Sequence, residues 1–417
     1  MECDDDDEGQ DDSETDSDDS EYEEAIPSSD KASKAKRKLE SVYAFKEVEI
    51  FVDTCKGKNN SSNEYEVTFH LLEMKRLGGG VNTTIGNNSG SLTANANLTN
   101  LFGRGEKLQL EYLRGTQQTM NCNLTFLKPI IGNRNTMFTS AIFQEGSDLE
   151  WCNINSLNRG ALIELAFNSS PKIKHRIRCE GIWRELNLMS NQTIFKIRKE
   201  MGHSLKCSLK HSLVLDHRNN PILPKKGFAF KLNNEFAGLG GDVSFHKHEV
   251  ELQLNKSILC DVVIQGSIIA GIMKPASKRS CSITDKFFIG GPLSLRGFKF
   301  HGCGPVERGL SFGANSYWAA ALHLFAPLPF SPGKGKLGDL FKTHFFINVG
   351  DIDDNLISKY SSTENILKSL RVAYGGGIIF RLGQDARFEL NYVVPIQVQS
   401  SDLPVHGLQF GVGVSFL

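Results

Sequence analysis

Residues 287–298 read FFIGGPLSLRGF, and this stretch governs how the rest of the chain is interpreted. It separates two strand-like segments, yet it is too apolar and too rich in glycine for an ordinary solvated loop. Gly290 and Gly291 allow backbone conformations that residues with a Cβ avoid, and Arg296 brings a permanent charge with a forked set of donors. We therefore expect a hairpin that folds into the interior and is fixed there by its arginine. A long surface loop with one exposed arginine is the alternative.

Residues 77–417 alternate apolar and polar side chains in segments separated by turn residues. The segments 204–213, 386–394 and 408–416 are the clearest cases. Such segments reach about ten residues, the length of a bilayer-spanning strand, whereas strands of soluble sandwiches average about five or six. At some twenty residues per strand and loop, about 340 residues make roughly sixteen strands. We therefore predict an all-β fold, a transmembrane antiparallel β-barrel of about 16 strands with a polar lumen.

Charge is distributed unevenly along the chain. The net charge is only −1 over 417 residues, but residues 1–25 are mostly Asp and Glu. Because so dense an acidic run cannot bury a core, we expect 1–30 to be a disordered acidic tail. The absence of a long apolar run predicts no transmembrane helix, and the acidic N-terminus is unlike a secretory signal or a transit peptide.

The sequence contains no pattern typical of a catalytic or metal-binding site. Its nine cysteines are scattered singly, without the spacing of a zinc or redox site. His203, His211 and His323 stand singly on predicted strands, and no Ser/His/Asp order stands out. Gly78–Gly80 lacks the Lys and Ser/Thr that follow in a phosphate-binding loop. We therefore expect a protein that is not an enzyme and uses no metal or cofactor.

The motif Gly-Gly-Pro-x-Ser-Leu-Arg-Gly-Phe at 290–298 resembles the sixth-loop signature of the outer-membrane barrel-insertase superfamily, which includes bacterial BamA. Within it, the chain is similar over about 48–417 to the barrel subunits of the mitochondrial sorting and assembly machinery. Further segments that carry the resemblance are 100–106, 126–129, 181–186 and 223–227. The residues of the loop motif are Gly290, Gly291, Ser294, Leu295, Arg296, Gly297 and Phe298.

The resemblance implies a mechanical function. Family members insert and fold β-barrel precursor proteins in the mitochondrial outer membrane through a lateral gate between the first and last barrel strands. Glycine weakens these strands here, and an exposed edge is a template for another strand. The last strand also matches the polar-x-Gly-x-x-apolar-x-apolar β-signal of client barrels. The expected gate residues are Gly78, Gly79, Gly80, Val81, Gln409, Gly411, Gly413, Val414 and Phe416.

The resemblance also implies the surroundings of the protein. The implied partners are β-barrel precursor proteins, metaxin-like subunits, an inner-membrane organising complex and the lipid bilayer, with no nucleic acid. The implied location is the mitochondrial outer membrane, as a multi-pass protein with its N-terminus in the intermembrane space.

The segment before the barrel resembles part of a POTRA domain. A basic, helix-compatible stretch at 31–39 precedes two alternating stretches at 48–52 and 67–71, which match the last two POTRA strands. A complete POTRA domain needs another strand and a helix upstream, which residues 1–38 are not expected to supply. We predict an acidic tail at 1–30, a POTRA-like remnant at 31–75, and a barrel at 76–417 with an inward-folded loop at about 281–307.

Arg296 needs fixed acceptors inside a lumen of reduced dielectric. Possible partners are His323 and Asn348, which lie where the superfamily carries acidic residues, and Glu389 at a lumen-facing position. The sequence does not choose among them, and it leaves open whether Arg296 acts in insertion or only supports the barrel. Two other functions also stay open: a passive outer-membrane pore, and a structural paralogue without insertase activity, which the shortened POTRA region favours.

Overall fold

In the computed structural model the chain forms two compact units, Met1–Lys75 and Arg76–Leu417. The first contains α1 (Pro27–Glu40), β1 (Phe45–Thr54) and β2 (Tyr65–Glu73), with β1 and β2 paired antiparallel. The residues that the structure describes are 27–40, 44–54, 65–85, 90–115, 119–130, 136–190, 193–258, 261–276, 281–328, 340–360, 363–382, 386–413 and 417.

One boundary in the first unit differs from the prediction. Helix α1 begins at Pro27, four residues before the helix-compatible stretch 31–39 and inside the 1–30 stretch predicted to be an acidic tail. The physical reason is composition: Ala, Lys, Arg and Leu, which dominate 31–39, are strong helix formers, and a proline suits the first helical turn. The acidic run 1–26 lies outside the described residues.

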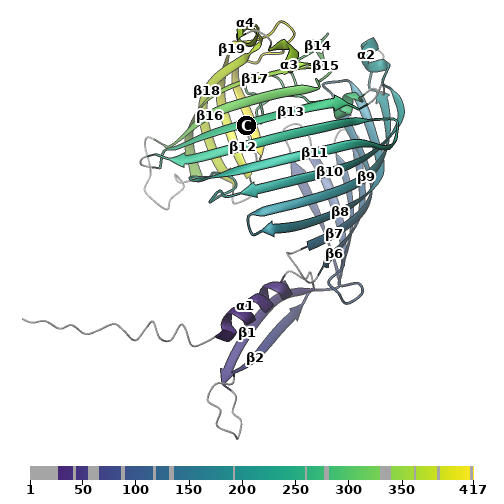
Figure 1. The fold of residues 1–417 in the computed structure, drawn as a ribbon, viewed down its shortest axis with the longest axis vertical. Coiled ribbons are helices and arrows are strands. Elements are labelled where there is room, and N and C mark those ends of the chain that lie inside the picture. The colour runs from purple at the N-terminus through teal and green to yellow at the C-terminus, as the bar shows by residue number, and fades with distance from the viewer. Residues whose placement is uncertain are drawn as a thin grey trace, which may run out of the picture. The chain divides into compact units, whose positions relative to one another are not determined.

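The second unit is a sixteen-stranded antiparallel β-barrel, which confirms the predicted fold class (Figure 1). Each strand between the first and the last pairs with both of its neighbours in the sheet, so its backbone groups that lipid cannot satisfy are paired. The strands are β3 (Leu77–Ile85), β4 (Gly90–Thr99), β5 (Lys107–Gly115), β6 (Met120–Ile130), β7 (Thr136–Leu149), β8 (Ile154–Ser170), β9 (Ile173–Leu188), β10 (Gly202–Asp216), β11 (Gly227–Gly241), β12 (Phe245–Ser257), β13 (Val263–Pro275), β16 (Ser316–Pro327), β17 (Phe341–Asp353), β18 (Arg371–Leu382), β19 (Ala386–Gln397) and β20 (Gly407–Gly413).

Side chains alternate across the barrel wall as the sequence indicates. Arg387, Glu389 and Asn391 of β19 are buried on the inner face. Leu390 and Tyr392, which lie between and beside them, are 48% and 58% exposed on the outer face. An apolar outer face is what a bilayer-spanning barrel presents to lipid, and the polar inner face lines the lumen.

Strand length varies around the barrel. β8 has 17 residues and β9 has 16, whereas β3 has 9 and β20 has 7. The predicted length of about ten residues is therefore close near the two ends of the sheet and too short for its middle.

Short helices interrupt the connections between strands, where the sequence indicated hardly any. They are α2 (Phe195–Arg198), α3 (Leu356–Lys359) and α4 (Thr363–Ser369). None of the helices in the described residues is long and apolar enough to cross a membrane.

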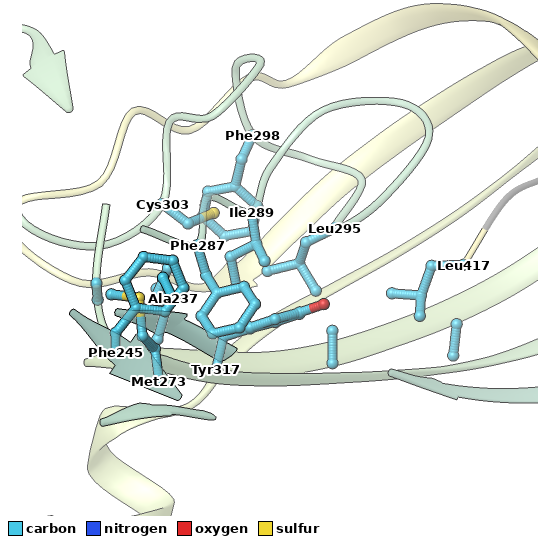
Figure 2. Close-up of a cluster of buried hydrophobic side chains, with 14 of the residues drawn as sticks. Ala237, Phe245, Met273, Phe287, Ile289, Leu295, Phe298, Cys303, Tyr317 and Leu417 are labelled. Carbon is cyan, nitrogen blue, oxygen red and sulfur yellow. The ribbon is translucent and has the colours of Figure 1, made fainter. Parts of the chain in front are cut away.

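The segment between β13 and β16 folds into the barrel. It contains the 3-10 helix η1 (Ile283–Asp285) and the two-residue strands β14 (Val306–Glu307) and β15 (Leu310–Ser311). Its apolar side chains contribute to two buried clusters, of which the larger packs against the inner face of the wall. Figure 2 shows Phe287, Ile289 and Leu295 of the segment gathered with Phe245, Met273 and Tyr317 of the strands. We call residues 281–315 the inward loop.

Gly271 of β13 lies under this packing. A Cβ there would come within 2.6 Å of Tyr317 and 2.7 Å of Phe287. We expect Gly271→Ala to destabilise the barrel by about 1–3 kcal/mol, because both rings must shift. Gly266→Ala is the matched control on the same strand, since a Cβ there meets nothing within 4 Å. Urea unfolding in detergent micelles checks this, and equal midpoints for the two variants would contradict it.

Candidate functional site

The guanidinium of Arg296 is completely buried at the tip of the inward loop. Its Nη2 donates to Glu389 Oε2 at 2.9 Å, and its Nη1 donates to the backbone carbonyl of Leu417 at 3.0 Å. The plane of the group lies over the ring of Phe346, with 4.9 Å between Cζ and the ring centroid. Arg296 therefore joins the loop to β17, to β19 and to the end of the chain.

Glu389 serves two cations at once. Besides Arg296, it forms an ion pair with Arg387, whose Nη2 lies 3.0 Å from Oε1, and its Oε2 accepts from the side-chain amide of Asn391 at 3.0 Å. All of these side chains are buried. A carboxylate that neutralises two buried guanidiniums cannot be lost without leaving an uncompensated charge in a low-dielectric interior.

The three predicted partners of Arg296 have different roles. Glu389 is the one that pairs with the guanidinium. Asn348 donates instead to the backbone carbonyl of Arg296 at 3.1 Å. His323 is hydrogen-bonded through Nδ1 to His344 Nε2 at 2.8 Å, and its role as a partner of Arg296 stays a prediction.

Two of the histidines expected to stand singly are paired. His323 pairs with His344, and His211 lies 3.4 Å from His175. His203 stacks obliquely near Trp183. The sequence could not reveal these pairs, because each joins residues of different strands whose register only the folded barrel defines.

The glycines of the loop motif are required by the backbone. Gly290, Gly291 and Gly297 have φ values of +115°, +113° and +90°, a region that residues with a Cβ rarely adopt. A Cβ on Gly297 would lie 2.8 Å from Ala373 on β18. The Ser294 hydroxyl accepts from the Gly290 amide at 3.1 Å. Leu295 and Phe298 are both fully buried, so the whole motif is packed.

A second buried ion pair, absent from our sequence predictions, holds the start of the loop. Asp285 accepts from both Nη1 and Nη2 of Arg184, at 2.7 and 2.8 Å, and from Lys206 at 2.9 Å. Lys247 donates to its backbone carbonyl at 2.7 Å. Burial alone would raise the pKa of Asp285, but the hydrogen bonds and charges of Arg184 and Lys206 outweigh burial and lower it. The available signal was an acidic residue two positions before the apolar run that begins at Phe287.

The two ion pairs lie on different walls of the barrel. Arg184 and Lys206 belong to β9 and β10, whereas Glu389 belongs to β19. The part of the inward loop from Asp285 to Arg296 thus crosses the lumen. Its acidic residue is bound to one wall, and its basic residue is bound to another.

The tip of the loop is also bonded to the last hairpin. The amide of Lys299 donates to the carbonyl of Leu403, the amide of Leu403 to Gly302, and the amide of Val405 to Gly297, each at 2.9 Å. Residues 398–406 connect β19 to β20. The connection before the last strand is therefore held by the loop through its backbone.

In the part of the chain that the structure describes, hydrogen bonding around the barrel is interrupted between β3 and β20. There β3 pairs only with β4, and β20 only with β19. On the β3 edge, Gly78, Gly79, Gly80 and Val81 lie opposite residues 94–97 of β4. On the β20 edge, Gln409, Gly411 and Gly413 lie opposite Asn391, Glu389 and Arg387, while Val414 and Phe416 lie outside the described residues.

Close packing does not explain all the glycines of β3. A Cβ on Gly78 would meet nothing within 4 Å, and one on Gly80 would only touch the side chain of Asn95 at 3.5 Å. Gly79 is tighter, at 3.0 Å from the Asn95 carbonyl. The glycines at 78 and 80 leave this edge without side chains to pack and with more entropy to lose on pairing.

Comparison with known proteins agrees with this geometry. The Omp85 superfamily domain matches residues 100–416. The "Sorting and assembly machinery component 50 homolog" proteins of Bos taurus and Homo sapiens are each 42% identical over 390 residues, covering 93% of this chain and 83% of each relative. The chain belongs to the sorting and assembly machinery component 50 family. The structure of BamA from Haemophilus ducreyi lacking POTRA domains 1–3 shares the fold, with a TM-score of 0.74 at 17% identity over 93% of this chain and 78% of that one.

The resemblance carried by the loop motif is thus confirmed. As a component 50 family member the chain has, in general terms, the role of a barrel insertase. The matched Omp85 region includes the inward loop, both ion pairs and β20, while β3 precedes it.

Glu389 gives the first prediction for this site. Glu389→Gln leaves Arg296 and Arg387 buried without a counter-charge, so we expect a loss of about 3–5 kcal/mol in the free energy of unfolding. Urea unfolding in micelles measures it. The control is Asp261→Asn, which removes an exposed pair with Lys225 and is expected to cost about 1 kcal/mol or less. Equal losses of unfolding free energy in the two variants would contradict the prediction that the buried ion pairs contribute more than the exposed one.

His301 of the inward loop gives a pH-dependent prediction. Its ring packs 4.4 Å from that of Trp151 and 3.9 Å from that of Phe300. Burial lowers the pKa of His301 from 6.5 to about 4. Between these values the unfolded chain binds a proton that the folded chain does not. The contribution of the neutral His301 ring to the free energy of unfolding is therefore complete above pH 6.5. It is lost progressively as the pH falls toward 4, because protons then bind the unfolded chain preferentially.

We expect His301→Phe to remove this part of the acid sensitivity. Urea midpoints measured at about pH 7 and about pH 4.5 should fall less in the variant than in the parent protein. An identical fall in both would mean that His301 does not titrate in this way.

Proposed function

We propose that this chain inserts and folds β-barrel precursor proteins into the mitochondrial outer membrane through a lateral gate between β3 and β20. The observation that carries the proposal is the seam, where each of these strands is paired on one side only among the described residues. An edge with unpaired N–H and C=O groups is a template for another strand. A precursor strand added there would gain hydrogen bonds that the bilayer cannot offer.

The composition of the two edges supports opening at this place. Among the described residues β20 pairs with β19 at seven positions, residues 414–416 being outside the described range, and β3 contains three consecutive glycines. Since glycine weakens strands, separating or exchanging a strand here disturbs less of the barrel than it would elsewhere. By comparison, β8 and β9 pair along 16 positions.

The inward loop supports an insertase over a passive pore. It is fixed across the lumen by the Asp285–Arg184 and Arg296–Glu389 ion pairs. A pore of the porin type needs a continuous water-filled passage, and a strut tied to opposite walls obstructs one. The alternative of a structural paralogue differs only in whether the seam accepts a client strand.

The remaining parts of the proposal follow from family membership. We place the chain in the mitochondrial outer membrane with its N-terminus in the intermembrane space. Its partners in this proposal are precursor β-barrels, metaxin-like subunits and an inner-membrane organising complex. The acidic tail and the 31–75 region then face the compartment from which precursors arrive.

Disulfide trapping in isolated mitochondria tests the gate. Val81→Cys and Leu408→Cys, made separately in a background without native cysteines, place a thiol on each seam edge. A precursor carrying one cysteine in its last strand is then imported. We expect mixed disulfides with the precursor at both edges, in register with the strand.

Ile268→Cys is the matched control, because it is also exposed on the outer face but lies on β13, inside the continuous wall. We expect no adduct there. If a double Val81→Cys, Leu408→Cys protein crosslinks only to itself, with or without precursor, the gate proposal fails and the structural paralogue is favoured.

A further inference from the structure

A hollow of about 280 Å³ opens on the outer face of the barrel, over four neighbouring strands. These strands, β12, β13, β16 and β17, lie side by side in the wall (Figure 1). Gly266 of β13 and Ala320 of β16 line the hollow together with larger side chains, among them Leu254, Ile268 and Leu322. Almost all of its lining residues are apolar. The hollow therefore faces lipid and offers it an apolar surface.

The strand register explains why a hollow forms here. Gly266 lies directly opposite Leu254 on one side and Leu322 on the other. Ala320 lies directly opposite Ile268 in the adjacent row. Because residues two apart on a strand point to the same face, the two small residues are diagonal neighbours on the outer face. Branched apolar side chains stand on both sides of them.

Neither packing nor backbone geometry requires glycine at position 266. Among the described residues, a Cβ built there would meet nothing within 4 Å, and the φ of Gly266 is not in the left-handed region. Gly376 of the outer face differs, since a Cβ there would lie 2.9 Å from the ring of Phe345. Glycine weakens a strand and often marks a place where a ligand approaches the backbone closely. The open space over Gly266 thus indicates an occupant from outside the chain.

A positive charge lies beside one end of the hollow. Lys256 is exposed on the outer face of β12, one residue before this strand ends at Ser257. It lies directly opposite Ile264, two residues before Gly266 on β13. Since a strand rises about 3.3 Å per residue, the lysine lies roughly 7 Å from the hollow along the strand. A lysine at the end of a membrane strand extends its ammonium group toward the headgroups, where it attracts lipid phosphates.

These two features restrict the kind of occupant. A strand of another chain cannot add here by backbone hydrogen bonds, because β12, β13, β16 and β17 are each paired on both sides. An acyl chain needs no hydrogen bonds and is narrow enough to lie between branched side chains. A phospholipid also carries its negative phosphate at the end of that chain, on the side where Lys256 lies.

We propose that the hollow is a binding site for one anionic phospholipid. An acyl chain lies over Gly266 and Ala320, and Lys256 binds the phosphate. The inward loop leaves the wall from β13 and returns to it at β16. Ala319 and Ala321 of β16 pack with the loop on the inner face, so the lipid braces the same two strands from outside. The site is independent of the proposed gate, because it lies within the continuous part of the wall.

Native mass spectrometry of the full chain tests the site. The protein is released from micelles that contain equal amounts of phosphatidylglycerol and phosphatidylcholine, and the phospholipids that stay bound are counted. We expect the parent protein to retain one phosphatidylglycerol. Gly266→Leu fills the hollow and should lower this retention roughly tenfold. Lys256→Gln should lower the preference for phosphatidylglycerol over phosphatidylcholine roughly fivefold.

Two variants are matched controls. Gly181→Leu changes a glycine on the outer face of β9, and Lys274→Gln removes an exposed charge at the other end of β13. Both should retain phosphatidylglycerol like the parent. Ala320→Leu fills the hollow from the neighbouring strand and replaces Gly266→Leu if that variant does not fold. Equal retention in the hollow-filling variants and the controls would mean that the hollow holds only the lipid that surrounds any barrel, and the proposal would be overturned.

A photoreactive lipid locates the acyl chain. Phosphatidylglycerol with a diazirine on one acyl chain is illuminated with the protein in nanodiscs, and the adducts are mapped by peptide sequencing. We expect adducts to be concentrated near Ile268 and Leu322 and to be lost in Gly266→Leu. Equal labelling near Ile142, which is exposed on the outer face of β7, would overturn the proposal. So would a Gly266→Leu protein with unchanged labelling and an altered oligomeric state, which would make the hollow an interface between copies.

Discussion

A buried guanidinium is the constraint on which the rest of this barrel depends. Arg296 has no exposed surface, and such a charge is tolerated only when acceptors surround it. Glu389, the Leu417 carbonyl and the face of Phe346 supply that environment from three separate parts of the chain. The loop, the last strands and the end of the chain are consequently positioned together. Moving one of them exposes the same charge, so their positions are energetically coupled.

The second ion pair fixes the orientation in which the inward loop docks inside the barrel. Asp285 is bound by cations of β9 and β10, whereas Arg296 is bound by the carboxylate of β19. Because the charges at the two ends are opposite, the loop cannot dock in the reverse sense without placing like charges together. The apolar cluster around Phe287 and Leu295 fills the space between. Hydrophobic burial thus provides much of the stability, and the ion pairs provide the orientation.

Local patterns in the sequence predicted the wall, because alternation has a period of two in every strand and reports which face meets lipid. They also predicted that 287–298 turns inward. The partner of Arg296 inside the lumen could not be predicted from the sequence. Arg296 and Glu389 are separated by 93 residues, and only the register of the barrel strands brings them together. Helix α1 was placed too late because residues 27–30, Pro-Ser-Ser-Asp, were counted with the acidic run, although proline and short polar residues suit the start of a helix.

The uneven strand lengths have a consequence for the surrounding lipid. With about 3.3 Å per residue and a tilt near 40°, the 9-residue strand β3 spans roughly 23 Å, and the 17-residue strand β8 roughly 43 Å. The hydrocarbon core of a bilayer is about 30 Å thick. Lipids beside β3 therefore shorten or tilt their chains to match the protein, whereas β8 is long enough to cross the core and continue beyond it. The membrane is thus expected to be thinner on the side of the molecule where β3 lies.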